Sequence, residues 1–415
     1  MKTTARKNKN ARSPYLLLKK LNRAAEIAYY YNFMPIEAPV VTNQDVKIAK
    51  QITESETHEK NYGEADCPEM RICAEEKVAL IRTCEERKLL NPAQATMLYY
   101  EGPIPRVGQR KTPKNAYKQI HLDILGTSKS IAEAELIKAS LEILREKGYK
   151  DLYIDINSVG DKDTLTHFTR EVNQFYRKHA DMLQTHCRTA LKKDLFAPLE
   201  CTHEKCVELA NQAPKSVSSL TETSRAHFTE VLEYIESMNV PYKIDNHLLG
   251  NRRVCSHTIF LIKTLNAIGK EDEPEVTLGL GYRMTSFAKK MESKRDLSAA
   301  GVTLIFKETR GDKKASHKMK KPQVYFIQIG FDAKRKSLDV IEALRHAKIP
   351  VHQSLAKDKL SSQIATAENM KVPYVVIIGQ KEALEGNAIV RDMSTRSQET
   401  ISLQDLPAHL KALKA

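Results

Sequence analysis

The alternation of strand-like and helix-like segments towards the C-terminus is the feature that most constrains the fold. Three strand-like segments alternate with two helix-like ones, in the order 323–330, 334–347, 350–353, 357–370 and 372–379. Strands separated by single helices of this length form βαβ units, whose strands run parallel in one sheet. The sequence therefore predicts a compact α/β domain with a largely parallel sheet at 322–415.

The rest of the chain is long enough for at least one further domain. The chain has 415 residues, of which 28% are charged and 41% hydrophobic, a composition typical of globular proteins. No apolar run approaches the roughly 18–20 residues needed to cross a bilayer, and no signal-peptide pattern follows the basic N-terminus. We therefore expect a cytoplasmic protein. Its seven scattered cysteines favour reduced thiols over a disulfide framework.

Positive charge is concentrated in two segments of the chain, whose formal net charge is +14. Residues 1–25 carry eight Lys or Arg and no acid, and residues 307–321 carry seven against two acids. We interpret 1–12 as a basic tail and 309–321, which has no apolar period, as a basic linker. Such segments are either solvated or in contact with nucleic-acid phosphates, and charge alone does not decide between the two.

The pattern over 13–308 predicts a domain of mixed strands and helices. A helix-like segment (14–31) comes first, and strand-like segments follow at 33–41, 70–74, 97–104, 117–125, 151–161, 242–245, 257–262 and 275–280. A long amphipathic helix begins at a capping box formed by Ser130 and Glu133. Residues 162–238 consist mainly of helix-like segments and polar loops.

The segment "YKQIHLDILG" (117–126) carries the clearest chemistry. Apolar residues alternate there with an amide, an imidazole and a carboxylate, which a strand places on one face: Gln119, His121 and Asp123. Such a face is either solvated or the floor of a polar pocket that binds an amine or an imidazole. Upstream, Arg106 in a Pro/Gly loop is the kind of guanidinium that holds a phosphate bidentately.

Together these segments resemble histidyl-tRNA synthetase, a class II aminoacyl-tRNA synthetase, over nearly the whole chain. "PIEAPVV", with Pro39, resembles motif 1 and implies a homodimer. "YYEGPIPR" resembles motif 2, with Arg106 at the arginine that grips the ATP α-phosphate. The segment "KVPYVVIIGQKEALEGNAIVRDMSTRSQE" (371–399) is very close to the family's anticodon-binding domain.

The resemblance implies an α+β fold. Its parts would be a class II synthetase core at 13–308, with an antiparallel sheet of six or seven strands, a helical insertion at 162–238, and an α/β anticodon-binding domain at 322–415. Gln119 and Asp123 would hold histidine, together with Glu75, which is kept from the family's R-P-E-G-T. The partner would be tRNA, and an active enzyme would use ATP and Mg²⁺.

Several positions depart from the family pattern near the nucleotide. The arginine and the paired tyrosines of R-G-L-D-Y-Y fall on Gly250, Val254 and Cys255 in "LLGNRRVCSHTIF". From G-G-R-Y-D the chain keeps Arg283 as an ATP-binding residue but has Met284 and Thr285 in place of tyrosine and aspartate. Three further departures are Gly108 at the motif 2 glutamate, Glu308 at the motif 3 arginine and Lys77 at the threonine of R-P-E-G-T.

Losing one charged donor to a transition-state oxyanion costs about 3–4 kcal/mol, or roughly 10²–10³ in rate. Arg252 lies two residues from Gly250, so in a strand it would project from the same face and could act as a substitute. Arg310 could not replace the motif 3 arginine in the same way, because i and i+2 diverge in a helix. We therefore favour an impaired activation site over a working one.

A metal site is a further hypothesis for "THCRTALKKDLFAPLECTHEKC" (185–206). Cys187, Cys201, His203 and Cys206, with His186 nearby, are ligand types that suit tetrahedral zinc. Their spacing is irregular, however, which favours free thiols over zinc.

Three functions remain open from the sequence. We favour a histidyl-tRNA synthetase homologue that binds tRNA and whose histidine and ATP activation is impaired or lost. The second is an active ATP-dependent histidine–tRNA ligase, with Arg252 or Arg283 as substitute phosphate ligands. The third is a non-catalytic regulatory subunit related to histidine biosynthesis, which the anticodon-binding domain places last.

Overall fold

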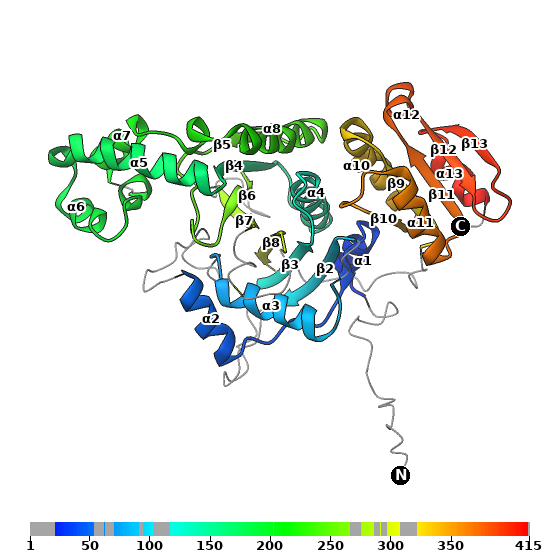
Figure 1. Ribbon diagram of the computed structural model, residues 1–415, viewed down its shortest axis with the longest axis horizontal. Helices are drawn as coiled ribbons and strands as arrows, with labels where there is room; N and C mark the ends of the chain where they lie inside the picture. The colour runs from blue at the N-terminus through cyan, green and yellow to red at the C-terminus, as the bar shows by residue number, and fades with distance from the viewer. Residues whose placement is uncertain are drawn as a thin grey trace, which may run out of the picture.

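The computed structural model describes residues 21–53, 62, 70–90, 94–102, 117–201, 203–265, 275–285, 291, 297–307 and 322–413. An eight-stranded sheet lies at the centre of the molecule, and a group of short helices projects from one side of it (Figure 1). A five-stranded sheet with its own helices lies on the opposite side. Among the described residues, no helix combines the length and the apolar character that a membrane crossing requires.

The central sheet has the strand order β1-β2-β3-β8-β7-β6-β4-β5. Its strands are β1 Met34–Pro35, β2 Thr96–Gly102, β3 Tyr117–Leu125, β4 Leu152–Gly160, β5 Tyr242–Ile244, β6 Ser256–Thr264, β7 Val276–Met284 and β8 Ala299–Lys307. All neighbours are antiparallel except the two edge pairs, β1–β2 and β4–β5, which are parallel. The expected α+β architecture with an antiparallel-rich sheet is therefore present, and the short edge strands bring the number of strands to eight.

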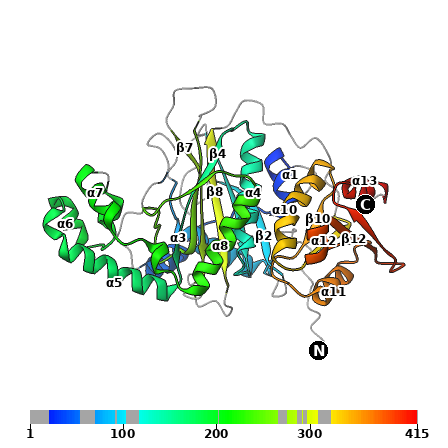
Figure 2. The same cartoon turned by 90° about the horizontal axis from the view of Figure 1, so that it is seen from above.

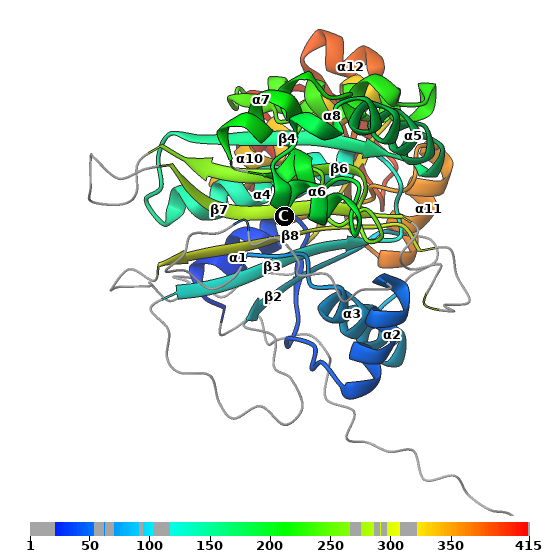
Figure 3. The same ribbon diagram turned by 90° about the vertical axis from the view of Figure 1, so that its left-hand side faces the viewer.

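Helices cover both faces of this sheet (Figure 3). One face carries α1 (Arg23–Tyr30), α4 (Ile131–Glu146) and α8 (Glu222–Ser237), and α2 (Asn43–Thr53) and α3 (Ala74–Glu86) lie on the other side. The three apolar residues of the alternating segment in β3 are fully buried in the core that includes α4: Ile120, Leu122 and Ile124. The strict alternation of "YKQIHLDILG" thus marks a strand with one apolar face, as predicted.

A glycine in β7 permits close packing against its neighbouring strand. The ring of Phe260 in β6 lies over Gly281, where an added Cβ would be 2.1 Å from the ring. Because Phe260 is itself fully buried, it cannot move aside into solvent. Only glycine fits at this position.

Two strand predictions outside β3 differ from the structure. Residues 70–74 were expected to form a strand, but α3 begins at Ala74 and the preceding residues form no ladder with any described strand. Met70 and Ile72 are both buried, so burial alternates here as it does along a strand, although the described residues around them form no strand ladder. Conversely, β8 is a strand that the pattern did not predict, because its apolar run is nearly continuous.

The predicted helical insertion consists mainly of short helices. They are α5 Lys162–Lys178, η2 Ala180–Met182, α6 Thr185–Leu191, η3 Ala197–Glu200, α7 Glu204–Gln212 and η4 Ser216–Ser219, and α8 follows them. The Asp161 side chain accepts hydrogen bonds from the backbone N–H of Thr164 and from the hydroxyls of Thr221 and Ser224. One carboxylate therefore caps α5 and ties it to the start of α8.

The C-terminal sheet has the order β10-β9-β11-β12-β13. Its elements are β9 Val324–Gln328, α10 Phe331–His346, β10 Val351–Gln353, α11 Leu360–Met370, β11 Tyr374–Ile378, α12 Gln380–Glu385, β12 Asn387–Asp392, β13 Gln398–Ser402 and α13 Leu406–Ala412. The predicted β-α-β-α-β unit gives three parallel strands, and β12 and β13 extend the sheet in antiparallel fashion.

The C-terminal domain packs against the central one through α10, which lies beside α1 and α4 (Figure 2). Arg345 in α10 forms an ion pair with Glu142 of α4 at 3.3 Å. Nearby, the Gln353 amide donates to the buried Glu135 carboxylate at 3.0 Å. These polar contacts between buried side chains fix the two domains relative to each other.

Candidate functional site

The polar face of β3 is a buried site rather than a solvated surface. His121 is 1% exposed and Asp123 is fully buried, while Gln119, two residues before His121, is only partly buried. The side chains around them come from β2, β8 and α3. The structure thus confirms that the amide, imidazole and carboxylate share one face, and it shows which groups surround two of them.

Asp123 forms a buried ion pair with Lys77 of α3. The Lys77 Nζ lies 2.6 Å from Oδ1 of Asp123, and the Tyr100 hydroxyl donates to Oδ2 at 2.8 Å. Across the ladder, a Cβ at Gly301 would be 2.1 Å from the same carboxylate, so a glycine is required there. Burial raises the pKa of Asp123, although Lys77 and Tyr100 both act to lower it.

His121 occupies the middle of the same face as a neutral imidazole. Its ring stacks on Tyr100 with the centroids 4.7 Å apart and the planes inclined by 10°. The Nδ1 atom lies 3.1 Å from the Thr303 hydroxyl, and Nε2 has no hydrogen-bond partner among the described residues. Burial and the nearby Lys77 ammonium hold the pKa of His121 well below its usual value.

Sequence reasoning missed most of the groups that complete this site. Tyr100, Thr303 and Gly301 carry no local signal, because their roles depend on the neighbours of β3 in the sheet. Lys77 had been noted only as a departure from the family pattern. Glu75, the other predicted amino-acid ligand, lies in the first turn of α3 and is partly buried.

Arg283, predicted to bind ATP, is a buried structural residue. It lies in β7, is 1% exposed, and forms two hydrogen bonds with the Glu133 carboxylate of α4. Its remaining N–H groups donate to the carbonyls of Thr127 and Lys129 and to the hydroxyl of Ser298. All five donors are used, so the predicted role at a phosphate does not fit this arrangement.

Arg252 does not lie on a strand, which corrects the expectation that it projects beside Gly250. Residues 251–254 form a turn, and β6 begins only at Ser256. The Arg252 guanidinium donates two hydrogen bonds to Asp194 of the insertion, at 2.8 and 2.7 Å, and stacks on Phe196 at 4.1 Å from the ring centroid. A possible substitute for the missing arginine is therefore already paired within the chain.

The position aligned with the family's arginine has no space for a side chain. Gly250 has φ = 62°, and an added Cβ would be 2.6 Å from Ile259 and 3.1 Å from Cys255 and Ile72. The other departures in this region, Val254, Cys255 and Met284, are all buried. Arg106, Gly108 and Glu308 lie outside the described residues.

The structure brings four of the five candidate metal ligands together. Their ligand atoms all lie within 4.8 Å of one another: His186, Cys187, Cys201 and Cys206. The predicted set contained His203 in place of His186, and the structure corrects this, because the group of close ligand atoms includes His186 and not His203. The backbone N–H of His203 donates to the Cys201 sulfur.

Buried histidines predict how the stability of the protein depends on pH. Burial lowers the pKa of His257 and of His352 to about 4 and also holds that of His121 well below its usual value, whereas unfolding restores about 6.5. These groups stay neutral in the folded chain, so the stability that they confer is lost as the pH falls below 6.5. Burial raises the pKa of Glu135 to about 7, which opposes this loss.

We therefore expect the free energy of unfolding to fall by a net amount of about 3 kcal/mol or more between pH 6.5 and pH 4. Urea unfolding at several pH values measures it, and His352→Gln should make the pH dependence shallower. A flat profile over this range would contradict the prediction.

The fold defines an α+β protein with a second, C-terminal sheet domain. Residues 323–413 of that domain match the family model described as an anticodon-binding domain. The chain as a whole is similar to histidine–tRNA ligases. It is 27% identical over 349 residues to the histidine–tRNA ligase of Desulforamulus reducens, covering 80% of this chain and 79% of the relative.

It is also 26% identical over 406 residues to the histidine–tRNA ligase of Halothermothrix orenii, covering 94% of each chain. Among solved structures, an apo histidyl-tRNA synthetase of S. aureus matches with a TM-score of 0.49 and 21% identity over 92% of both chains.

Proposed function

We propose that this protein binds tRNA through its anticodon-binding domain and activates histidine poorly or not at all. The proposal that histidine is activated poorly or not at all rests on the buried ion pair between Lys77 and Asp123. The resemblance assigns Asp123 to the histidine substrate. In this chain that carboxylate is already paired with a cation of the protein itself.

The ion pair imposes a large cost on any external ligand. Lys77 is 3% exposed and Asp123 fully buried, so an incoming amine or imidazole would have to displace the ammonium and leave it without a counter-ion. Breaking a buried pair of this kind costs about 3–5 kcal/mol. That range corresponds to a weakening of binding by roughly 10²–10⁴.

The second group that histidine would bring is also supplied by the chain. His121 places an imidazole on the same face, stacked on Tyr100 and bonded to Thr303. Lys77 supplies an amine and His121 an imidazole, so the chain itself already fills the site with two of the polar groups that a histidine substrate would bring. A histidine substrate would lose translational freedom on binding, whereas these side chains are already held in the site by the chain, so the substrate would compete at a disadvantage.

Among the described residues, none of the arginine positions assigned to the ATP phosphates offers a free guanidinium. Arg283 uses every donor, Arg252 is paired with Asp194, and Gly250 has no space for an arginine. Each missing donor to a developing oxyanion costs about 3–4 kcal/mol. ATP would therefore be held less well, and Mg²⁺ could neutralise only part of its charge.

Association with tRNA is supported by the C-terminal domain and by the net charge of +14. Cationic side chains that neutralise phosphates release counter-ions, so such binding weakens steeply with salt. The motif 1 resemblance at Pro39 further supports a homodimer, which the mass in solution would test.

Histidine-dependent ATP–pyrophosphate exchange, measured beside tRNA binding, tests the proposed function. We expect exchange at least about 10³-fold below that of an ordinary synthetase, because both the amino-acid and the phosphate ligands are compromised. We expect tRNA to bind with an affinity that falls with salt. A histidine–tRNA ligase assayed in parallel is the control.

Two outcomes would contradict the proposal. Exchange at ordinary rates would favour the active ligase. A chain that binds no tRNA at low salt would favour a regulatory role without tRNA.

A further inference from the structure

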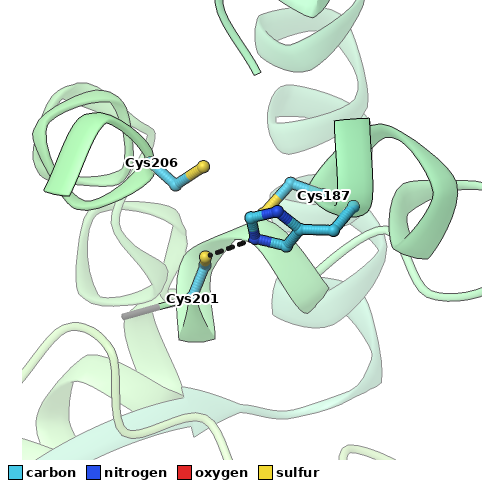
Figure 4. A group of neighbouring side chains, drawn as sticks. Cys187, Cys201 and Cys206 are labelled. Carbon is cyan, nitrogen blue, oxygen red and sulfur yellow. Dashed lines mark hydrogen bonds between the residues drawn. The ribbon is translucent and has the colours of Figure 1, made fainter. Parts of the chain in front are cut away.

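We propose that His186, Cys187, Cys201 and Cys206 form a structural zinc site in the helical insertion (Figure 4). Three sulfur atoms and one imidazole nitrogen converge there from separate segments. His186 and Cys187 lie in the first turn of α6, Cys201 directly follows η3, and Cys206 lies in α7.

The distances between the ligand atoms suit a tetrahedral ion after a small contraction. The His186 Nε2 atom is 3.3 Å from the Cys201 Sγ atom, and all four ligand atoms lie within 4.8 Å of one another. Tetrahedral zinc with bonds of about 2.0–2.3 Å places its ligand atoms roughly 3.5–3.8 Å apart. A shift of about 1 Å or less would therefore complete the coordination.

The chemistry of the ligand set selects the metal and its role. Thiolates with one imidazole favour zinc and disfavour Mg²⁺ or Ca²⁺, which prefer oxygen ligands. Four protein ligands leave no open position for water or substrate, which is typical of structural sites. The backbone N–H of His203 donates to the Cys201 sulfur at 3.4 Å, as outer groups do when they stabilise a metal-bound thiolate.

Burial and helix length indicate why the insertion would need an ion. Cys187 is 2% and Cys206 1% exposed, yet neither is in a disulfide. The elements that carry the ligands are short, with seven residues in α6, four in η3 and nine in α7. Helices of this length are not stable alone, so cross-linking them through one ion would stabilise the insertion.

The site also has a connection to the synthetase-like core. The segment between α6 and η3 carries Asp194 and Phe196, which hold the Arg252 guanidinium. An ion that joins α6 to the end of η3 would fix both ends of this segment. Zinc would thereby keep Arg252 in its pair with Asp194.

Metal analysis of the full-length protein, purified under reducing conditions without chelator, tests the site. We expect one zinc per chain, and Co²⁺ in its place should give the absorption bands of a tetrahedral thiolate complex. His186→Gln and Cys201→Ser should each lower the zinc content about tenfold or more. His203→Gln and Cys73→Ser, which lie outside the cluster, should leave it unchanged.

Hydrogen exchange gives a second measurement that does not depend on these variants. Removal of zinc by a chelator should increase exchange over residues 185–206 more than in the central sheet. His186 is exposed, so His186→Gln decides the question even if Cys201→Ser does not fold.

A reduced chain that carries no zinc and takes up no stoichiometric Co²⁺ would overturn the proposal. Loss of zinc in His203→Gln together with its retention in His186→Gln would overturn the ligand set. A disulfide between two of the three cysteines, found by thiol titration of the denatured chain, would also overturn it.

Discussion

Lys77→Met is expected to lower the free energy of unfolding by about 3–5 kcal/mol at neutral pH. The substitution keeps most of the volume of the lysine stem but leaves the fully buried Asp123 carboxylate without its counter-ion. Only the Tyr100 hydroxyl would still donate to it. Urea unfolding of the variant and the natural chain measures the difference.

The pH dependence of this loss follows from the Asp123 carboxyl. Burial already raises its pKa, and removal of the Lys77 ammonium removes both the charge and the hydrogen bond that lower it most. A raised pKa in the folded state means that protonation relieves the cost. The deficit of Lys77→Met should therefore be largest at pH 7 to 8 and should shrink towards pH 4.

Two further variants make the Lys77 prediction specific. Lys77→Met combined with Asp123→Asn removes both charges and should recover most of the lost stability. Lys381→Met breaks an exposed pair with Glu385 and should cost about 1 kcal/mol or less. Equal losses in the single and double variants would contradict a role for the buried charge.

The ligand response of Lys77→Ala connects this pair to the proposed function. The shorter side chain frees the carboxylate and leaves space for an external amine. Millimolar histidine should then raise the thermal midpoint of the variant and leave that of the natural chain unchanged. A natural chain that is stabilised equally by histidine would contradict the view that Lys77 occupies the site.

Arg283→Met is expected to cost about 3–5 kcal/mol as well. The variant would leave the Glu133 carboxylate with His227 as its remaining partner and would remove the Arg283 donors to the carbonyls of Thr127 and Lys129. Burial alone would raise the pKa of Glu133, but Arg283 and His227 lower it far below its usual value. Thermal or urea unfolding at neutral pH measures the loss.

The pH dependence of the stability loss in Arg283→Met checks whether the loss comes from the Glu133 carboxylate. In the natural chain the depressed pKa of Glu133 contributes stability above pH 4.5 that is lost as the pH falls. Without Arg283 the pKa of Glu133 rises, so the deficit of Arg283→Met should shrink in acid. Arg335→Met, which breaks an exposed pair with Asp332, is the control and should cost about 1 kcal/mol or less. A loss as small as that of the control would show that the Arg283 pair is not structural.

Local periodicity was a good guide to the elements of the fold. The strict alternation in β3 placed Ile120 on the apolar face and Asp123 on the polar one, because the two faces of a strand repeat every two residues. The same kind of pattern predicted the parallel strands of the C-terminal domain. It failed where burial alternates without a ladder, at Met70 and Ile72, and where both faces of a strand are apolar, in β8.

The partners of the charged groups could not be predicted in the same way. Lys77 and Asp123 are 46 positions apart, and Arg283 and Glu133 are 150 apart. Arg252 was expected on a strand, but it lies in a turn that directs it to Asp194. In each case the partner depends on which elements pack together, and a sequence pattern does not contain that information.

The sequence by itself determined the types of element, the apolar and polar faces of β3 and the βαβ order of the C-terminal domain, because side-chain periodicity is a local property. Only the tertiary structure decided that Lys77 neutralises Asp123, that Arg283 is buried against Glu133, and that His186 rather than His203 joins the three cysteines. Ion pairs and metal ligands act over a few ångströms, so they are decided by how distant segments are brought together.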